Sequence, residues 1–133
     1  MANQQRKIGF VGTPETNPET KPFFDGAAQH KLTLPRCNAC GRTHWYPRAV
    51  CPHCYSQDLR WIEASGKGTI YSFSVMKRAA IPYAIAYVAL AEGTTMLTNI
   101  VETDLDAIRI GQPVRVTFLP TEGGPPMPMF TPD

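Results

Sequence analysis

The stretch CNACGRTHWYPRAVCPHCYS, residues 37–56, contains all four cysteines of the 133-residue chain. They form two C-x2-C pairs, Cys37 with Cys40 and Cys51 with Cys54, and ten residues separate the pairs. Four thiolates make a complete tetrahedral ligand set for zinc, with Zn–S bonds of ~2.3 Å and no open position for a catalytic water. The spacing therefore predicts a structural zinc site that holds a small ribbon together.

The residues that follow the two pairs differ. Gly41 comes after Cys40 and suits a tight knuckle, because glycine tolerates a positive φ. Tyr55 takes the equivalent place after Cys54, so we expect the second knuckle to be less regular. The ten-residue spacer is shorter than the roughly 15–20 residues of common zinc patterns, which favours a compact ribbon.

Other interpretations of the cysteines stay open at this point. A rubredoxin-like iron site uses the same four thiolates, and a lost metal or disulfides are further options. Because four cysteines complete the ligand set, we expect His44 and His53 to be exposed loop residues. A ribbon of about 20 residues is too small to fold without a metal ion or a disulfide to stabilise it, so the metal is expected to be structural rather than catalytic.

The composition excludes several classes of protein. With 43% hydrophobic residues the chain can build a core, and its 13 prolines and 10 glycines indicate short elements joined by turns. A net charge of +2 creates no strong field for nucleic acid or anionic membranes. No apolar run approaches the ~20 residues of a membrane span, and the first residues lack the apolar stretch of a secretory signal. We therefore expect a cytoplasmic protein with reduced thiols and no membrane partner.

Four parts are expected along the chain. They are an N-terminal arm with short helices (1–36), the zinc ribbon (37–58), an OB-type barrel (59–120) and an irregular, proline-rich tail (121–133). In the arm, Phe23, Phe24, Ala27 and Ala28 have the spacing of one buried helix face. The arm is therefore expected to be helical in this segment.

After the ribbon, hydrophobic residues alternate with polar ones, as in β-strands. Two strands are expected at about 59–64 and 68–77, a hairpin around Glu92–Gly93, and a last strand ahead of the tail. About five strands with turns between them favour a closed barrel of the OB type, because closure removes exposed sheet edges. The predicted fold class is therefore mainly β.

The succession of these parts resembles a known family. The arm sequence PFFDGAAQHKLTLPRC leads into the cysteine pairs, and ASGKGTIYSFSV, PYAIAYVAL and IGQPVRVTF follow. This order is similar to the family that joins a rubredoxin-like zinc ribbon to an OB fold, long classed as a domain of unknown function. The resemblance covers roughly residues 20–131. Departures are Tyr55, where glycine is usual, and Phe24, where tryptophan is common.

The resemblance implies an accessory role. Members of the family accompany thiolase-like acyl-CoA enzymes, as in the benzylsuccinate-pathway thiolase, phloroglucinol acetyltransferase and steroid aldolase complexes. It implies a zinc-binding subunit in a hetero-oligomer with a dimeric thiolase core. The partner would cleave a carbon–carbon bond or transfer an acyl group, and would bind most of any coenzyme A thioester.

The sequence offers no catalytic residues of its own. The metal engages the cysteines, and no G-x-S-x-G, H-E-x-x-H or phosphate-cradling loop occurs. Exposed apolar loops often mark interfaces, and cations pair with phosphates. On these grounds the expected contacts with the partner or coenzyme A are Lys77, Arg78, Pro82, Tyr83, Phe23 and Phe24.

Binding of single-stranded nucleic acid by the OB fold is the alternative function. Such binders combine a basic groove with stacking aromatic rings. Rings are available at Tyr71, Phe73, Tyr83 and Tyr87, but residues 59–120 carry six Lys/Arg against five acids. The nearly neutral charge argues against nucleic acid, and we expect the strand aromatics to lie in the barrel core.

Overall fold

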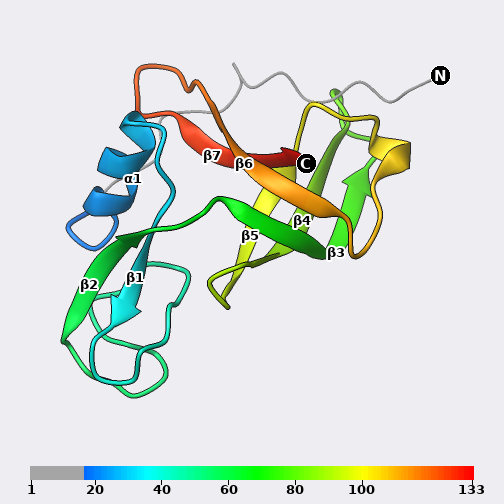
Figure 1. Cartoon of the computed structure of the whole chain (residues 1–133). Helices are drawn as coiled ribbons and strands as arrows, with labels where there is room; N and C mark the ends of the chain where they lie inside the picture. Colours follow the sequence, from blue (N-terminus) through cyan, green and yellow to red (C-terminus); the bar gives the residue numbers. More distant parts are fainter. Residues whose placement is uncertain (1–16) are drawn as a thin grey trace.

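A computed structural model describes residues 17–133, and Figure 1 shows a mainly β protein in this part of the chain. Its elements are α1 (Lys21–Ala28), β1 (Thr33–Cys37), β2 (Leu59–Glu63), β3 (Lys67–Met76), β4 (Tyr83–Leu90), β5 (Thr95–Ile100), the 3-10 turn η2 (Leu105–Ala107), β6 (Pro113–Leu119) and β7 (Met127–Pro132). The predicted fold class is confirmed: a helix precedes a four-cysteine cluster, and a closed five-stranded barrel follows. The predicted arm before residue 17 lies outside the described residues.

The barrel closes in the strand order β3-β4-β5-β7-β6 (Figure 1). Its neighbouring strands are antiparallel except β5 and β7, which run parallel and meet at Ile100 and Phe130. One side chain from each strand illustrates how the interior is filled: Ile70, Val88, Ile100, Phe130 and Val114 are all buried. Removing this apolar surface from water is the main term that stabilises the barrel.

The five strands of the barrel are not the five that the sequence indicated. The first expected strand, observed as β2, pairs with β1 in a separate two-stranded sheet from Thr33–Glu63 to Cys37–Leu59. The tail, expected to be irregular, instead contributes β7, which pairs with β6 over its whole length. Proline-rich sequence is tolerated there because β7 pairs with β5 at only one position, so few of its amides are needed as donors.

The helix α1 belongs to the core of the molecule. The Asn17 side chain accepts hydrogen bonds from the backbone amides of Glu19 and Thr20 at 3.0 Å, forming the turn that precedes the helix. Phe23 and Phe24 are buried in the core that also includes the barrel interior. Ala28, which was expected on the same buried helix face, is exposed. The burial of the two rings argues against the predicted partner contact at Phe23 and Phe24, which stays a prediction. Within residues 17–133 no helix is long and apolar enough to cross a membrane.

Hydrogen bonds join the ribbon segment and its linker to the barrel. Thr43 Oγ1 donates to the backbone carbonyl of Glu92 at 3.1 Å, and the Glu92 side chain accepts from the amide of Ser65 at 2.9 Å. Buried Leu32 and Leu34 continue the barrel core toward the ribbon. The cysteine module is thus packed on the turn between β4 and β5.

The strand aromatics do not fill the barrel, contrary to expectation. Tyr71 and Tyr87 are exposed, Phe73 reaches 36% exposure and Tyr83 is half-buried. The register of β3 against β4 shifts between Ile70 and Ser72, so the alternation read from the sequence breaks at this point. On β3 and β4 the side chains that enter the barrel are therefore aliphatic, as at Ile70, Ala86 and Val88.

Candidate metal centre

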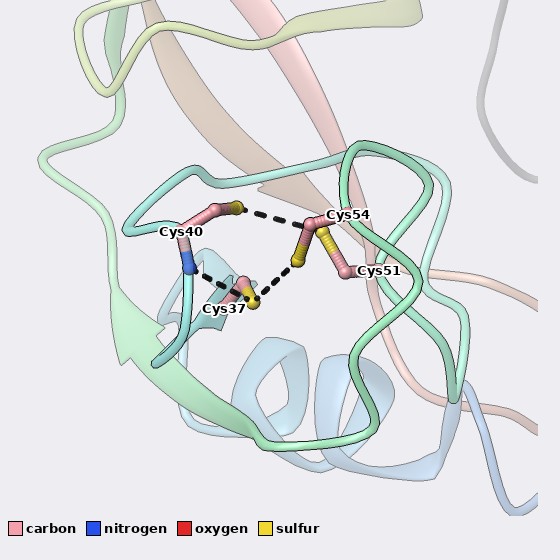
Figure 2. Close-up of side chains that lie close together, drawn as sticks. All are labelled: Cys37, Cys40, Cys51 and Cys54. Atoms are coloured by element: carbon pink, nitrogen blue, oxygen red, sulfur yellow. Dashed lines mark hydrogen bonds between the residues drawn. The ribbon is translucent and has the colours of Figure 1, made fainter.

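The four cysteines come together from two turns that are separated by ten residues of the sequence. Cys37 ends β1, Cys40 follows in the same turn, and Cys51 and Cys54 belong to the turn before β2 (Figure 2). All four are free thiols, and their sulfurs lie within 4.8 Å of one another. The Cys37–Cys54 and Cys40–Cys51 sulfur distances are 3.5 and 3.7 Å.

These distances can be compared with what a metal requires. Sulfurs bound tetrahedrally to one ion at ~2.3 Å lie ~3.8 Å from each other. The Cys37–Cys54 and Cys40–Cys51 distances of 3.5 and 3.7 Å are close to this value, and all four sulfurs lie within 4.8 Å of one another, so the four cysteines are positioned to bind a metal ion.

The two cysteine turns have the same backbone geometry. The amide of Gly41 donates to the Cys37 carbonyl, and the amide of Tyr55 donates to the Cys51 carbonyl, each at 2.9 Å. In both turns the residue after the second cysteine has a positive φ, +78° at Gly41 and +66° at Tyr55. The second knuckle is therefore as regular as the first, because Tyr55 adopts the left-handed conformation that glycine would adopt there.

Tyr55 gives a test of this conformational strain. We expect Tyr55→Gly to raise the free energy of unfolding of the metal-loaded protein by about 1 kcal/mol, because a left-handed conformation costs a residue with a Cβ atom roughly that much. The ring is 79% exposed, so its loss removes little packing. Denaturant unfolding measures the effect, and Tyr55→Ala is the matched control, since it removes the ring but keeps Cβ. An equal gain for the alanine variant would show that strain is not the cause.

The electrostatics of the cluster favour a bound cation. The backbone amide of Cys40, which donates to the Cys37 sulfur at 3.4 Å, lowers the pKa of Cys37 to about 6. At Cys54 the backbone amide of Ser56 acts to lower the pKa, but the three neighbouring cysteine sulfurs, Cys37 above all, together with desolvation outweigh it and raise the pKa to about 12. One cysteine thiolate thus opposes the ionisation of a neighbouring cysteine thiol. A bound divalent cation would remove this opposition and allow all four cysteines to be deprotonated together.

The two ribbon histidines have different surroundings. His53 is exposed, as predicted, and its Nε2 lies 3.3 Å from the Thr43 carbonyl oxygen. His44 was also expected to be exposed, but it is 2% exposed, because its amide donates to the Pro35 carbonyl and brings the residue against β1. Burial lowers the pKa of His44, which favours its neutral form. Neither histidine belongs to the sulfur cluster.

Three of the predicted contact residues meet at one end of the barrel. Lys77 and Arg78 follow β3, and Tyr83 begins β4, where it lies opposite Met76. All three line a hollow of about 540 Å³, and Pro82 precedes Tyr83 without lining it. The Lys77 ammonium lies 3.4 Å from the Asp106 carboxylate, and both groups are exposed.

A four-cysteine ribbon packed on a closed five-stranded barrel defines a class of two-module proteins. Two family models match the chain in this order. "ChsH2, rubredoxin-like zinc ribbon domain" matches residues 24–60, and "ChsH2, C-terminal OB-fold domain" matches residues 61–119. The chain belongs to this ChsH2 family, also called DUF35.

The chain is similar to one solved structure and to several curated proteins. A chain of the "Ltp2-ChsH2(DUF35) aldolase" structure has a TM-score of 0.79 and 36% identity, covering 90% of this chain and 98% of that one. The "Probable enoyl-CoA hydratase alpha subunit" of Thermomonospora curvata is 36% identical over 97% of this chain, which spans 42% of that relative's length. The "Benzoylsuccinyl-CoA thiolase subunit BbsA" of Geobacter metallireducens is 30% identical over 64% of this chain and 60% of its own length.

Proposed function

We propose that this chain is an accessory subunit of an enzyme complex that acts on acyl-CoA substrates. The observation that carries the proposal is the likeness to the ChsH2 chain of an aldolase, which extends over nearly all of both chains. The other two relatives carry names of a hydratase subunit and a thiolase subunit. The reaction, cleavage or formation of a bond next to an activated acyl group, belongs to the partner chain.

The site geometry supports a structural role for this chain. Its cysteines are the strongest nucleophiles that it has, and they face one another as a ligand set (Figure 2). We propose that they hold a zinc ion, which leaves no position for a substrate or water. Cysteines kept as metal ligands call for a reducing compartment, and we propose the cytoplasm.

The co-purifying partner is the first test of this function. We expect a tagged full-length chain, purified from its own host, to bring down an enzyme chain of the thiolase, aldolase or hydratase type in constant stoichiometry, as identified by mass spectrometry. The reconstituted pair should turn over an acyl-CoA, and the isolated chain should not. Turnover by the isolated chain, or a monomer that brings down no such enzyme, would contradict the proposal.

The hollow beside Lys77 is the place that we propose for the phosphates of coenzyme A. Lys77 and Arg78 supply cations at its rim, and Tyr83, preceded by Pro82, supplies an apolar wall. Charge-assisted contacts with phosphate are among the stronger hydrogen bonds in proteins. The Lys77–Asp106 pair is exposed and therefore weak, so a phosphate can compete for the ammonium group.

The double variant Lys77→Ser, Arg78→Ser tests this placement. In the complex we expect KM for the acyl-CoA to rise about tenfold at low salt with kcat unchanged, since ~1.4 kcal/mol of ground-state binding is lost. Steady-state kinetics at two ionic strengths measure the change. Lys21→Ser, which removes an equally exposed cation from α1, is the matched control. A KM unchanged from wild type would place coenzyme A elsewhere.

A further inference from the structure

The outer face of the barrel carries an apolar stripe. It consists of Tyr83, Ile85 and Tyr87 on β4 together with Leu97 on β5, and is called the outer stripe below. Alternate residues of a strand point to the same side of the sheet, and the intervening residues of β4, Ala84 and Ala86, are buried in the barrel. The outer stripe therefore faces away from the core.

The cross-strand register places the stripe in one continuous surface. Tyr87 lies opposite Ser72 on β3 and opposite Leu97 on β5, and Ile85 lies opposite Ser74. Residues opposite one another in a sheet share a face. Tyr87 and Leu97 are 49% and 51% exposed, so two large hydrophobic side chains on neighbouring strands are both exposed to solvent.

The surface is also hollowed and uncharged. A shallow depression of about 150 Å³ lies between the strands, with Ser72, Ser74, Ile85, Tyr87 and Leu97 around it. None of the residues that line it carries a charge. A partner that matches this surface has to be neutral and apolar at the point of contact. The polar groups that it would need to hydrogen-bond there are the hydroxyls of Ser72 and Ser74 and of Tyr87.

The charges of the barrel argue against nucleic acid as the occupant. Among the described residues, Lys67 and Arg115 both pair with Asp133, and Lys77 pairs with Asp106. Binders of single strands need a positively charged groove along the aromatic platform. Here the rings are present, but no residue that lines the depression beside Tyr87 carries a positive charge, and the basic pair Lys77 and Arg78 lies only at the Tyr83 end of the outer stripe.

We propose that the outer stripe is the docking surface for the acyl-CoA enzyme chain, which places an apolar patch of its own on Tyr87 and Leu97. This inference rests on the proposed function. Tyrosine anchors beside a small pocket are typical of the residues that dominate binding energy at interfaces. The stripe also begins at Tyr83, which lines the hollow beside Lys77 and Arg78. An enzyme chain seated on β4 would therefore lie next to that basic pair.

The double variant Tyr87→Ser, Leu97→Ser tests the docking surface. Both side chains point outward, so the barrel should keep its melting temperature and its metal content. We expect the dissociation constant of the complex with the purified enzyme chain, measured by calorimetry, to rise about 30-fold or more. Tyr55→Ser is the matched control, because it removes an even more exposed tyrosine from the ribbon. Its complex is expected to bind within threefold of wild type.

The outcomes separate this inference from the proposed function. A complex that forms normally with the double variant contradicts the docking surface alone. A wild-type chain that binds no such enzyme contradicts the proposed function, and the docking surface with it. Two further results would also overturn the inference: an isolated chain that dimerises through these residues by light scattering, or a labelled single-stranded oligonucleotide that binds wild type but not the double variant at low salt.

Discussion

Cys51→Ser is expected to abolish metal binding and to unfold the ribbon. Cys51 is buried, its sulfur lies 3.7 Å from that of Cys40, and it also accepts a hydrogen bond from the His53 amide. Structural zinc contributes an apparent ~10–16 kcal/mol to the folding of small zinc modules. This folding free energy exceeds what so short a segment can obtain by burying its own side chains. We therefore expect the two cysteine turns to unfold when the metal is lost.

Metal analysis and hydrogen exchange together measure this effect. We expect one zinc per wild-type chain and less than about a tenth of that in Cys51→Ser, since loss of one thiolate opens the ligand set. The amides of β1 and β2 should lose protection from exchange, while those of the barrel keep it. His53→Ala is the control, because His53 is exposed and lies between the same cysteines without being a ligand. Full metal content in Cys51→Ser would contradict the four-cysteine site, and a coloured iron-loaded protein would contradict zinc.

Phe130→Ala is expected to lower the free energy of unfolding by about 3–5 kcal/mol, because it removes a large side chain from a packed interior. Phe130 is 0% exposed, lies opposite Val116 on β6 and meets Ile100 on β5. It thus occupies the point where β7 closes the barrel. A loss of this size is a large part of the stability of a domain this small.

Denaturant unfolding of three chains measures the role of the tail. Asp133→Asn is the control for Phe130→Ala, because the Asp133–Lys67 pair at 2.9 Å is exposed and should change stability by less than about 1 kcal/mol. A chain that ends at residue 126 lacks β7 and leaves β5 and β6 each with one unpaired edge, so we expect its barrel not to fold. If this truncated chain unfolded like wild type, the tail would be dispensable, as its composition alone suggests.

Much of the site could be predicted because its information is local. The C-x2-C spacing determines two short turns, and the ligand chemistry of sulfur then leaves few choices of metal. The hairpin around Glu92–Gly93 and the buried faces of Phe23 and Phe24 also follow from neighbouring residues. These features need no knowledge of distant parts of the chain.

The wrong predictions concern residues whose partners are distant in the sequence. His44 looked like a loop residue, yet it is buried where the ribbon packs against β1. Tyr87 looked like core, yet it faces outward because Ala86 and Val88 are the residues that fit the barrel. Either face of a strand can be hydrophobic, and only the closed sheet decides which one is inside.

By itself, then, the sequence determined the four-cysteine cluster, the order of the modules and the mainly β character of the chain, because short spacings and alternation encode them. The tertiary structure alone shows which strands close the barrel. Residues 59–63 pair with β1 beside the ribbon, and residues 127–132 form the strand between β5 and β6. The physical reason is that strand pairing depends on burial gained between distant segments. Phe130 gains that burial inside the barrel, whereas β2 gains its backbone partners beside β1, next to the cysteines.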